Sequence, residues 1–129
     1  MAVTHTMTFD TNILIAYLDK EEPAFSSCKR YKELGVPFIL PAIVEAELLA
    51  YLHWSMEQRN AVERFLEDNF VFVPLDRAVA RMTAEIRRQT RLKSPDAAIA
   101  ATALFTNTPL VTRNVRDFKK VPGLQAMTL

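Results

Sequence analysis

The chain has 129 residues, of which 50% are hydrophobic and 24% charged, and only 2 are glycine. This composition excludes a disordered or fibrous protein, and the length suits one globular domain spanning residues 1–129. The longest apolar run, Val36 to Val44, is far shorter than the roughly 20 residues of a membrane helix, and no basic-then-apolar leader opens the chain. A single cysteine, Cys28, fits a reducing compartment. We therefore expect a cytoplasmic protein that makes no membrane contact.

The net charge of +1 conceals an uneven distribution along the chain. Residues 1–76 contain 12 acidic and 6 basic side chains, whereas residues 77–129 contain 3 acidic and 10 basic ones. Such a division indicates a polyanion bound to one part of the surface, and a basic partner is compatible with the other part. Solvated helix faces that differ by chance are the alternative.

Short apolar runs alternate with helical patterns, and turn or cap residues separate them. The predicted strands are Val3–Phe9, Phe38–Leu40, Phe70–Val73, Leu110–Thr112 and an edge strand at Gln125–Thr128. The predicted helices are Asn12–Leu18, Phe25–Leu34, 41–54, Glu57–Asp68, a helix capped by Asp76 that runs to about Arg91, and Ala97–Phe105, for which Ser94-Pro95-Asp96 is the start signal.

Strands separated by helices require crossover connections, which favour a mainly parallel sheet with helices on both faces. The two helical segments 41–54 and 95–105 are apolar nearly all round, so we expect both to be buried. The predicted fold is a three-layer α/β/α sandwich. In such folds, ligands bind outside the carboxyl ends of the strands.

Because ligands bind at the carboxyl ends of the strands, three aspartates near these ends are candidate site residues. Asp10 comes directly after the first strand, Asp96 opens the helix that leads to the fourth strand, and Asp117 follows that strand. Each also has a purely structural interpretation: Asp10 as a helix cap, Asp96 as an acid favoured by a helix dipole, and Asp117 as a turn residue.

Glu47 is the strongest single candidate. Its neighbours on a helix surface are apolar, namely Ile43, Val44, Tyr51 and Trp54. A carboxylate there needs a compensating cation, unless it reaches water or a salt bridge. Glu45 lies about 160° away around the same helix, so the two glutamates cannot face one pocket. We expect Glu47 in the site and Glu45 on another face or at an interface.

Four carboxylates that all lie near the carboxyl ends of the strands would repel one another without a cation. Hard oxygen ligands select Mg²⁺ or Mn²⁺, as one or two ions. The two histidines are far apart in sequence and accompany no cysteine pair, which argues against zinc. Basic side chains flank the acids, and a metal–carboxylate centre rimmed by them suits a phosphodiester. The candidate RNA-binding residues are Arg87, Arg88, Arg91, Lys93, Arg113 and Arg116, and Lys119 and Lys120 also flank Asp117.

Four segments carry a family resemblance: Phe9–Ile15, Ala46–Leu49, Asp96 with Ile99–Ala103, and Leu110–Phe118. In this order and spacing they resemble the signature blocks of PIN-domain ribonucleases, most closely the VapC-type toxins of bacterial type II toxin–antitoxin modules. The similarity runs from Thr8 to Leu129.

The resemblance implies a Mg²⁺- or Mn²⁺-dependent endoribonuclease that leaves a 5′-phosphate and a 3′-hydroxyl. It also implies a homodimer and a VapB-type antitoxin that presents a basic side chain to the acidic pocket. The implied acidic residues are Asp10, Glu47, Asp96 and Asp117. Thr11, Thr112 and Asn114 match the polar positions that support the metal site. Glu45 departs from the family pattern, where a small or hydroxylated residue is usual.

Three other functions stay open at this point. An RNA-binding or assembly module with the same fold would lack turnover, and a DNA nuclease would use the same chemistry. A receiver-like signalling domain also binds Mg²⁺ at strand ends, but it needs paired acids after the first strand, where this chain has Asp10 followed by Thr11 and Asn12.

Overall fold

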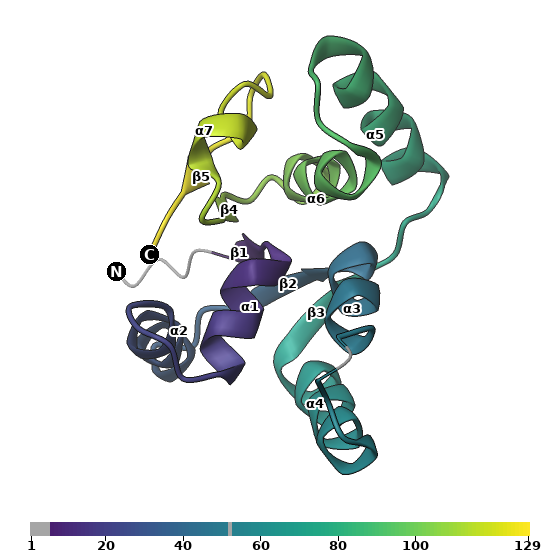
Figure 1. Cartoon of the computed structure of the whole chain (residues 1–129). Helices are drawn as coiled ribbons and strands as arrows, with labels where there is room; N and C mark the ends of the chain where they lie inside the picture. Colours follow the sequence, from purple (N-terminus) through teal and green to yellow (C-terminus); the bar gives the residue numbers. More distant parts are fainter. Residues whose placement is uncertain (1–5, 52) are drawn as a thin grey trace.

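The computed structural model describes residues 6–51 and 53–129, and its strands and helices alternate as Figure 1 shows. The strands are β1 (Met7–Phe9), β2 (Phe38–Pro41), β3 (Phe70–Val73), β4 (Leu110–Val111) and β5 (Ala126–Met127). The helices are α1 (Thr11–Leu18), α2 (Ala24–Glu33), α3 (Ala42–Leu49), α4 (Met56–Asn69), α5 (Arg77–Gln89), α6 (Ser94–Phe105) and α7 (Val115–Phe118).

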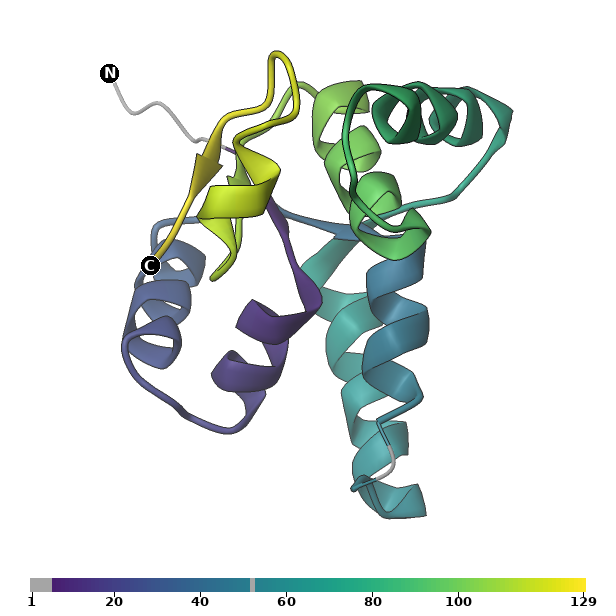
Figure 2. The same cartoon turned by 45° about the horizontal axis from the view of Figure 1, so that its top comes forward.

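The five strands form one parallel sheet in the order β3-β2-β1-β4-β5. Helices α1, α2 and α4 lie on one side of it, and α5, α6 and α7 lie on the other (Figures 1 and 2). The predicted three-layer α/β/α fold is therefore confirmed. After β3 the chain crosses back past β1 to form β4, so the strand order reverses between β1 and β4. Such a switch point leaves a crevice at the carboxyl ends of the strands.

An aromatic cluster joins the three strands on one half of the sheet. The Phe9 and Phe38 rings meet edge to face with centroids 4.5 Å apart, and the Phe70 ring lies 5.6 Å from that of Phe38. Phe9 and Phe38 are almost completely buried. Burying such rings stabilises the sheet by roughly 1.5–3 kcal/mol each, and it fixes the register that positions the end of β1.

Helix α6 matches its prediction, but α3 does not. All residues of α6 from Ala97 to Ala103 are buried, as the apolar pattern predicts. The predicted helix 41–54 ends at Leu49 instead, because the Trp54 indole N–H donates to the Leu48 carbonyl at 2.8 Å and closes the last turn. Only two residues of α3 are fully buried. The expectation that this helix is buried on all sides is therefore wrong.

The remaining differences are small and local. Helix α7 is absent from the predictions, since four residues are too few to show a helical period. Helix α5 ends at Gln89, two residues before the predicted end. Pro41 closes β2 as its last residue and precedes the first turn of α3. Val3 and His5, in the first half of the predicted first strand, lie outside the described residues.

Two further findings bear on function. Cys28 is fully buried, and burial raises the pKa of its thiol to about 12, so this cysteine is a packing residue rather than a nucleophile. Within residues 6–51 and 53–129, no helix has the length and apolar character that crossing a membrane requires.

Candidate active site

The topology brings the four candidate acids to one edge of the sheet. Asp10 directly follows β1, and Glu47 lies on α3, which begins where β2 ends. Helix α6 runs back across the sheet before β4, so Asp96 in its first turn also lies near the carboxyl ends of the strands. Asp117 lies on α7, immediately after β4. Acids that are remote in sequence therefore surround the crevice at the switch point.

Asp10 is both a helix cap and a buried acid. Its side chain is 6% exposed. Its Oδ1 accepts a hydrogen bond from the Thr11 backbone N–H at 2.8 Å, which caps α1, and its Oδ2 accepts one from the Thr112 hydroxyl at 2.7 Å. Burial raises the pKa of the Asp10 carboxyl, while these two hydrogen bonds lower it and the charge on Glu47 raises it slightly. The capping interpretation and the site interpretation are thus compatible.

Hydroxyl and amide groups orient two more of the acids. The Thr11 hydroxyl donates to Glu47 Oε1 at 2.6 Å, which joins α1 to α3. The Asn114 side-chain amide donates to Asp117 Oδ2 at 3.0 Å. Groups that fix the rotamer of a metal-binding carboxylate in this way are typical of metal sites.

Thr112 connects the two halves of this arrangement. It is fully buried, and its hydroxyl donates to Asp10 while accepting the Asn114 backbone N–H at 2.9 Å. The three polar residues singled out from the sequence therefore each contact one of the acids. Which residue would hold which acid was not predictable, because every pair except Asn114–Asp117 is formed across the fold.

Asp96 shows most clearly that the four acids share one electrostatic field. Burial is the main cause that raises the pKa of its carboxyl. The negative charges of Asp10, Glu47 and Asp117 raise that pKa further, and the charge on Lys93 lowers it. Glu45 is not among the groups that act on Asp96. Of the two glutamates on α3, Glu47 is therefore the one whose charge acts on Asp96.

Among residues 6–51 and 53–129, no arginine or lysine forms an ion pair with any of these four acids. Within the part of the chain that the structure describes, the one ion pair joins Arg113 to Glu21 at 2.9 Å. In the same residues, no group of three or more His, Cys, Asp or Glu side chains surrounds a point where a metal ion could sit. The four acids are therefore near enough for their charges to act on Asp96, but among the described residues they do not close around one point.

The donor set fits a hard divalent cation. All four candidate ligands are carboxylates, and threonine or asparagine groups hold three of them at defined rotamers. Oxygen ligands of this kind suit Mg²⁺ or Mn²⁺, which keep several waters and need only a few protein ligands. Side-chain rotation would have to bring the carboxylates closer together when the ion binds.

The predicted RNA-binding residues have different roles in the structure. All six are exposed. Arg113 pairs with Glu21, and the Arg87 guanidinium donates to the Ser94 hydroxyl at 3.0 Å. Arg91 lines a hollow beside Asp117.

Comparison with known proteins identifies the family. The PIN domain family model matches residues 7–124. The chain belongs to the PIN domain family. A relative, the ribonuclease VapC1 of Rickettsia felis, is 26% identical over 132 residues, which cover 95% of this chain and 96% of that protein.

Solved structures superpose along almost the whole chain. A toxin–antitoxin complex from Klebsiella pneumoniae has a TM-score of 0.77 at 28% identity and covers 92% of this chain and 94% of its own. VapBC2 of Rickettsia felis, bound to a DNA fragment from its promoter, has a TM-score of 0.80 at 22% identity, with 96% and 98% covered. This second likeness establishes the shared fold.

The buried hydroxyl of Thr112 provides a test of the site that needs no substrate. The Thr112→Val substitution keeps the shape of the side chain but removes the donor to buried Asp10 and the acceptor for Asn114. Leaving such groups unpaired costs about 1–3 kcal/mol, so we expect the free energy of unfolding at pH 7 to fall by that amount. Urea denaturation measures it, with Thr112→Ser as the control that keeps the hydroxyl. Equal denaturation midpoints for wild type and Thr112→Val would contradict the described network.

Proposed function

We propose that this PIN domain is a Mg²⁺- or Mn²⁺-dependent endoribonuclease that hydrolyses RNA phosphodiester bonds, with Asp10, Glu47, Asp96 and Asp117 as its catalytic and metal-binding residues. The observation that carries the proposal is the environment of Asp96. Its carboxyl lies in the field of the three other acids, and among the described residues none of the four forms an ion pair. The names of the VapC ribonucleases that resemble this chain support the choice of RNA.

Each residue of the site has a defined task in this proposal. Asp10, Glu47 and Asp96 would hold the principal ion, and Asp117 would hold a second ion or orient the attacking water. An ion bound there would lower the pKa of water and stabilise negative charge on the phosphoryl group. Thr11, Thr112 and Asn114 keep the carboxylates aimed at the crevice, through the hydrogen bonds described above.

We further propose that the chain is a single domain over residues 1–129 and acts in the cytoplasm as the toxin of a type II toxin–antitoxin pair. The relatives that are known as VapBC and toxin–antitoxin complexes support a VapB-type antitoxin as its partner. Exposed apolar residues support a protein contact such as a homodimer: Val71 and Phe72 of β3 are 52% and 49% exposed, and Leu75 is 50% exposed.

Cleavage of labelled RNA by the purified protein tests the proposed activity. We expect a 5′-labelled RNA to be cut within the chain in Mg²⁺ or Mn²⁺ and to stay intact when EDTA removes the ions. A DNA strand of the same sequence serves as the substrate control, because a DNA nuclease would cut it at a comparable rate. Tight RNA binding without any ion-dependent cleavage would instead favour the alternative, an RNA-binding or assembly module without turnover.

A further inference from the structure

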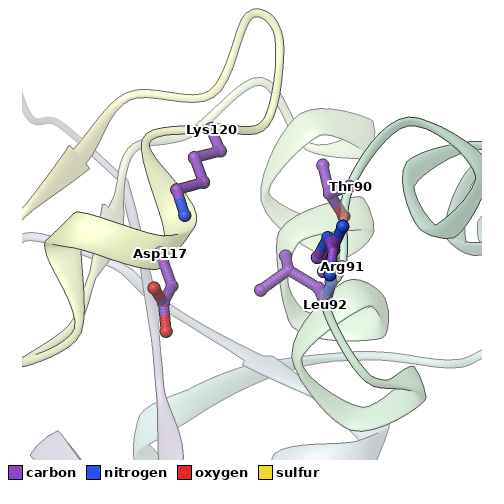
Figure 3. A pocket seen from close by; sticks show the side chains of 5 residues that line it. All are labelled: Thr90, Arg91, Leu92, Asp117 and Lys120. Atoms are coloured by element: carbon purple, nitrogen blue, oxygen red, sulfur yellow. The ribbon is translucent and has the colours of Figure 1, made fainter.

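A hollow beside the candidate acids is lined by residues from two distant parts of the chain. It contains about 340 Å³ of empty space and is bordered by Thr90, Arg91, Leu92, Asp117 and Lys120. The first three belong to the segment between α5 and α6, whereas Asp117 lies on α7 and Lys120 follows that helix. Figure 3 shows the two groups facing each other across the hollow. Asp117 thus belongs both to this hollow and to the acid set.

The hollow has two cations that no acid of the described chain engages. Arg91 and Lys120 are both exposed, and neither forms an ion pair within residues 6–51 and 53–129. Two unpaired cations at the rim of one cavity attract an anion with several acceptor oxygens, and a phosphate is the matching group. The Asp117 carboxylate also lines the hollow and repels an anion, so the two positive charges must outweigh its single negative charge when a phosphate binds there.

The backbone around these cations is held in place. The Thr90 hydroxyl donates to the Ile86 carbonyl at 2.8 Å and accepts the Leu92 backbone N–H at 3.2 Å, which closes a tight turn around Arg91. The backbone N–H of Lys120 bonds the Asp117 carbonyl at 3.3 Å. The backbone positions of Arg91 and Lys120 are therefore held, while their exposed side chains can turn toward a bound phosphate.

Leu92 adds an apolar surface to the same hollow. It is half-buried, packs partly against the core and points its side chain toward the side of Asp117 (Figure 3). An apolar side chain beside two cations matches a nucleotide, because the flat face of its base is apolar while its phosphate is charged.

We infer that this hollow binds the nucleotide next to the cleaved bond of the RNA, with Arg91 and Lys120 on its phosphate and Leu92 against its sugar or base. The inference rests on the proposed function, because the hollow shares Asp117 with the acid set. It also distinguishes among the basic residues: Arg91 and Lys120 act on the substrate, while Arg113 and Arg87 are already engaged within the protein.

Salt-dependent binding of a short single-stranded RNA tests the inference. The protein is used as the Asp96→Asn variant, which is expected to cut far more slowly than the wild type, and the buffer contains EDTA. Fluorescence anisotropy follows a labelled RNA of mixed sequence at several KCl concentrations. Each of Arg91→Ala and Lys120→Ala is expected to weaken binding on the order of 10-fold and to lower the slope of log affinity against log salt by about 0.7. Leu92→Ala is expected to weaken binding without changing the slope.

Lys119→Ala is the matched control, because Lys119 is exposed next to Lys120 but does not line the hollow. In the otherwise wild-type protein, the two hollow variants should raise the KM for RNA cleavage and leave kcat within about 2-fold, as expected for uniform binding. If Arg91→Ala and Lys120→Ala behave like Lys119→Ala, the hollow does not bind the RNA.

The outcome also separates this inference from the proposed function. If the wild type cuts RNA, and Arg91→Ala and Lys120→Ala bind and cut RNA as the wild type does, the inference alone is overturned. If the wild type never cuts RNA, the proposed function is overturned. If the hollow variants bind RNA normally but lose an acidic protein partner, the cations serve that partner instead, and the inference is wrong.

Discussion

The Asp96→Asn substitution is expected to lower kcat/KM for RNA cleavage by ~100-fold or more, which corresponds to at least about 2.7 kcal/mol of transition-state stabilisation. The change removes a charge and almost no volume, and Asp96 is the residue on which the other three acids act. Interactions of a metal ion with its substrate are worth several kcal/mol, so losing one of its ligands accounts for a loss of this size. Initial rates of cleavage in Mg²⁺ measure the effect.

Asp76→Asn is the matched control for this experiment. Asp76 also begins a helix, where its side chain accepts the Val79 N–H, and asparagine can cap the helix as well. It is not among the groups that act on Asp96. We expect its cleavage rate to equal that of the wild type. Circular dichroism of both variants should show the wild-type fold, and cleavage by Asp96→Asn at the wild-type rate would refute the proposed site.

The second large effect is a stability difference that changes sign when a divalent ion is added. In EDTA at neutral pH, we expect Asp96→Asn to be more stable than the wild type. In saturating Mn²⁺ we expect the wild type to be more stable, because an ion present at 100 times its dissociation constant stabilises the folded state by about 2.7 kcal/mol. Urea denaturation of both proteins, with and without Mn²⁺, measures the four free energies of unfolding.

In EDTA, the difference in free energy of unfolding between wild type and Asp96→Asn depends on pH, because the pKa of Asp96 is raised in the folded protein. The folded state holds the Asp96 proton more tightly than the unfolded chain does, because the pKa of this carboxyl in the unfolded chain is close to its ordinary value of 3.8. Stability from this proton is fully present below that value and is lost as pH rises through the higher pKa of the folded protein. Wild type and variant should therefore have equal stability at low pH, and the advantage of the variant should grow as pH rises through that window.

A pair of glutamates on α3 provides the control for the ion effect. Glu47→Gln should lose much of the stabilisation by Mn²⁺, because Glu47 acts on Asp96 and accepts the Thr11 hydroxyl. Glu45→Gln should keep it, since Glu45 is not among the groups that act on Asp96. Equal loss in both variants would mean that Mn²⁺ acts through general surface charge and not through the acid set.

The order of strands and helices was predictable because local patterns determine it. Phe70–Val73 is a short apolar run between polar segments, and it forms a strand with the predicted bounds. The Asp76 and Ser94-Pro95-Asp96 signals also mark true helix starts. The end of α3 was not predictable in this way, because the Trp54 indole that closes it comes from beyond the helix.

The sequence predicted where the site residues lie in the fold, but not which of them form hydrogen bonds with one another. A parallel sheet places Asp10 and Thr112 at the same edge, since both directly follow neighbouring strands. Their hydrogen bond, however, joins residues 102 positions apart and depends on the register of β1 with β4. The hollow is a similar case, since Arg91 and Lys120 meet only after α6, β4 and α7 have packed.

X-ray diffraction at the manganese absorption edge, from crystals of the wild-type protein grown in Mn²⁺, tests the central claim most directly. We expect an anomalous difference peak within coordination distance of the carboxylate oxygens of Asp10 and Asp96 and of at least one of Glu47 and Asp117. A fully occupied Mn²⁺ elsewhere on the protein, with the four carboxylates still apart or paired with arginines, would contradict the claim that these acids together form one metal centre.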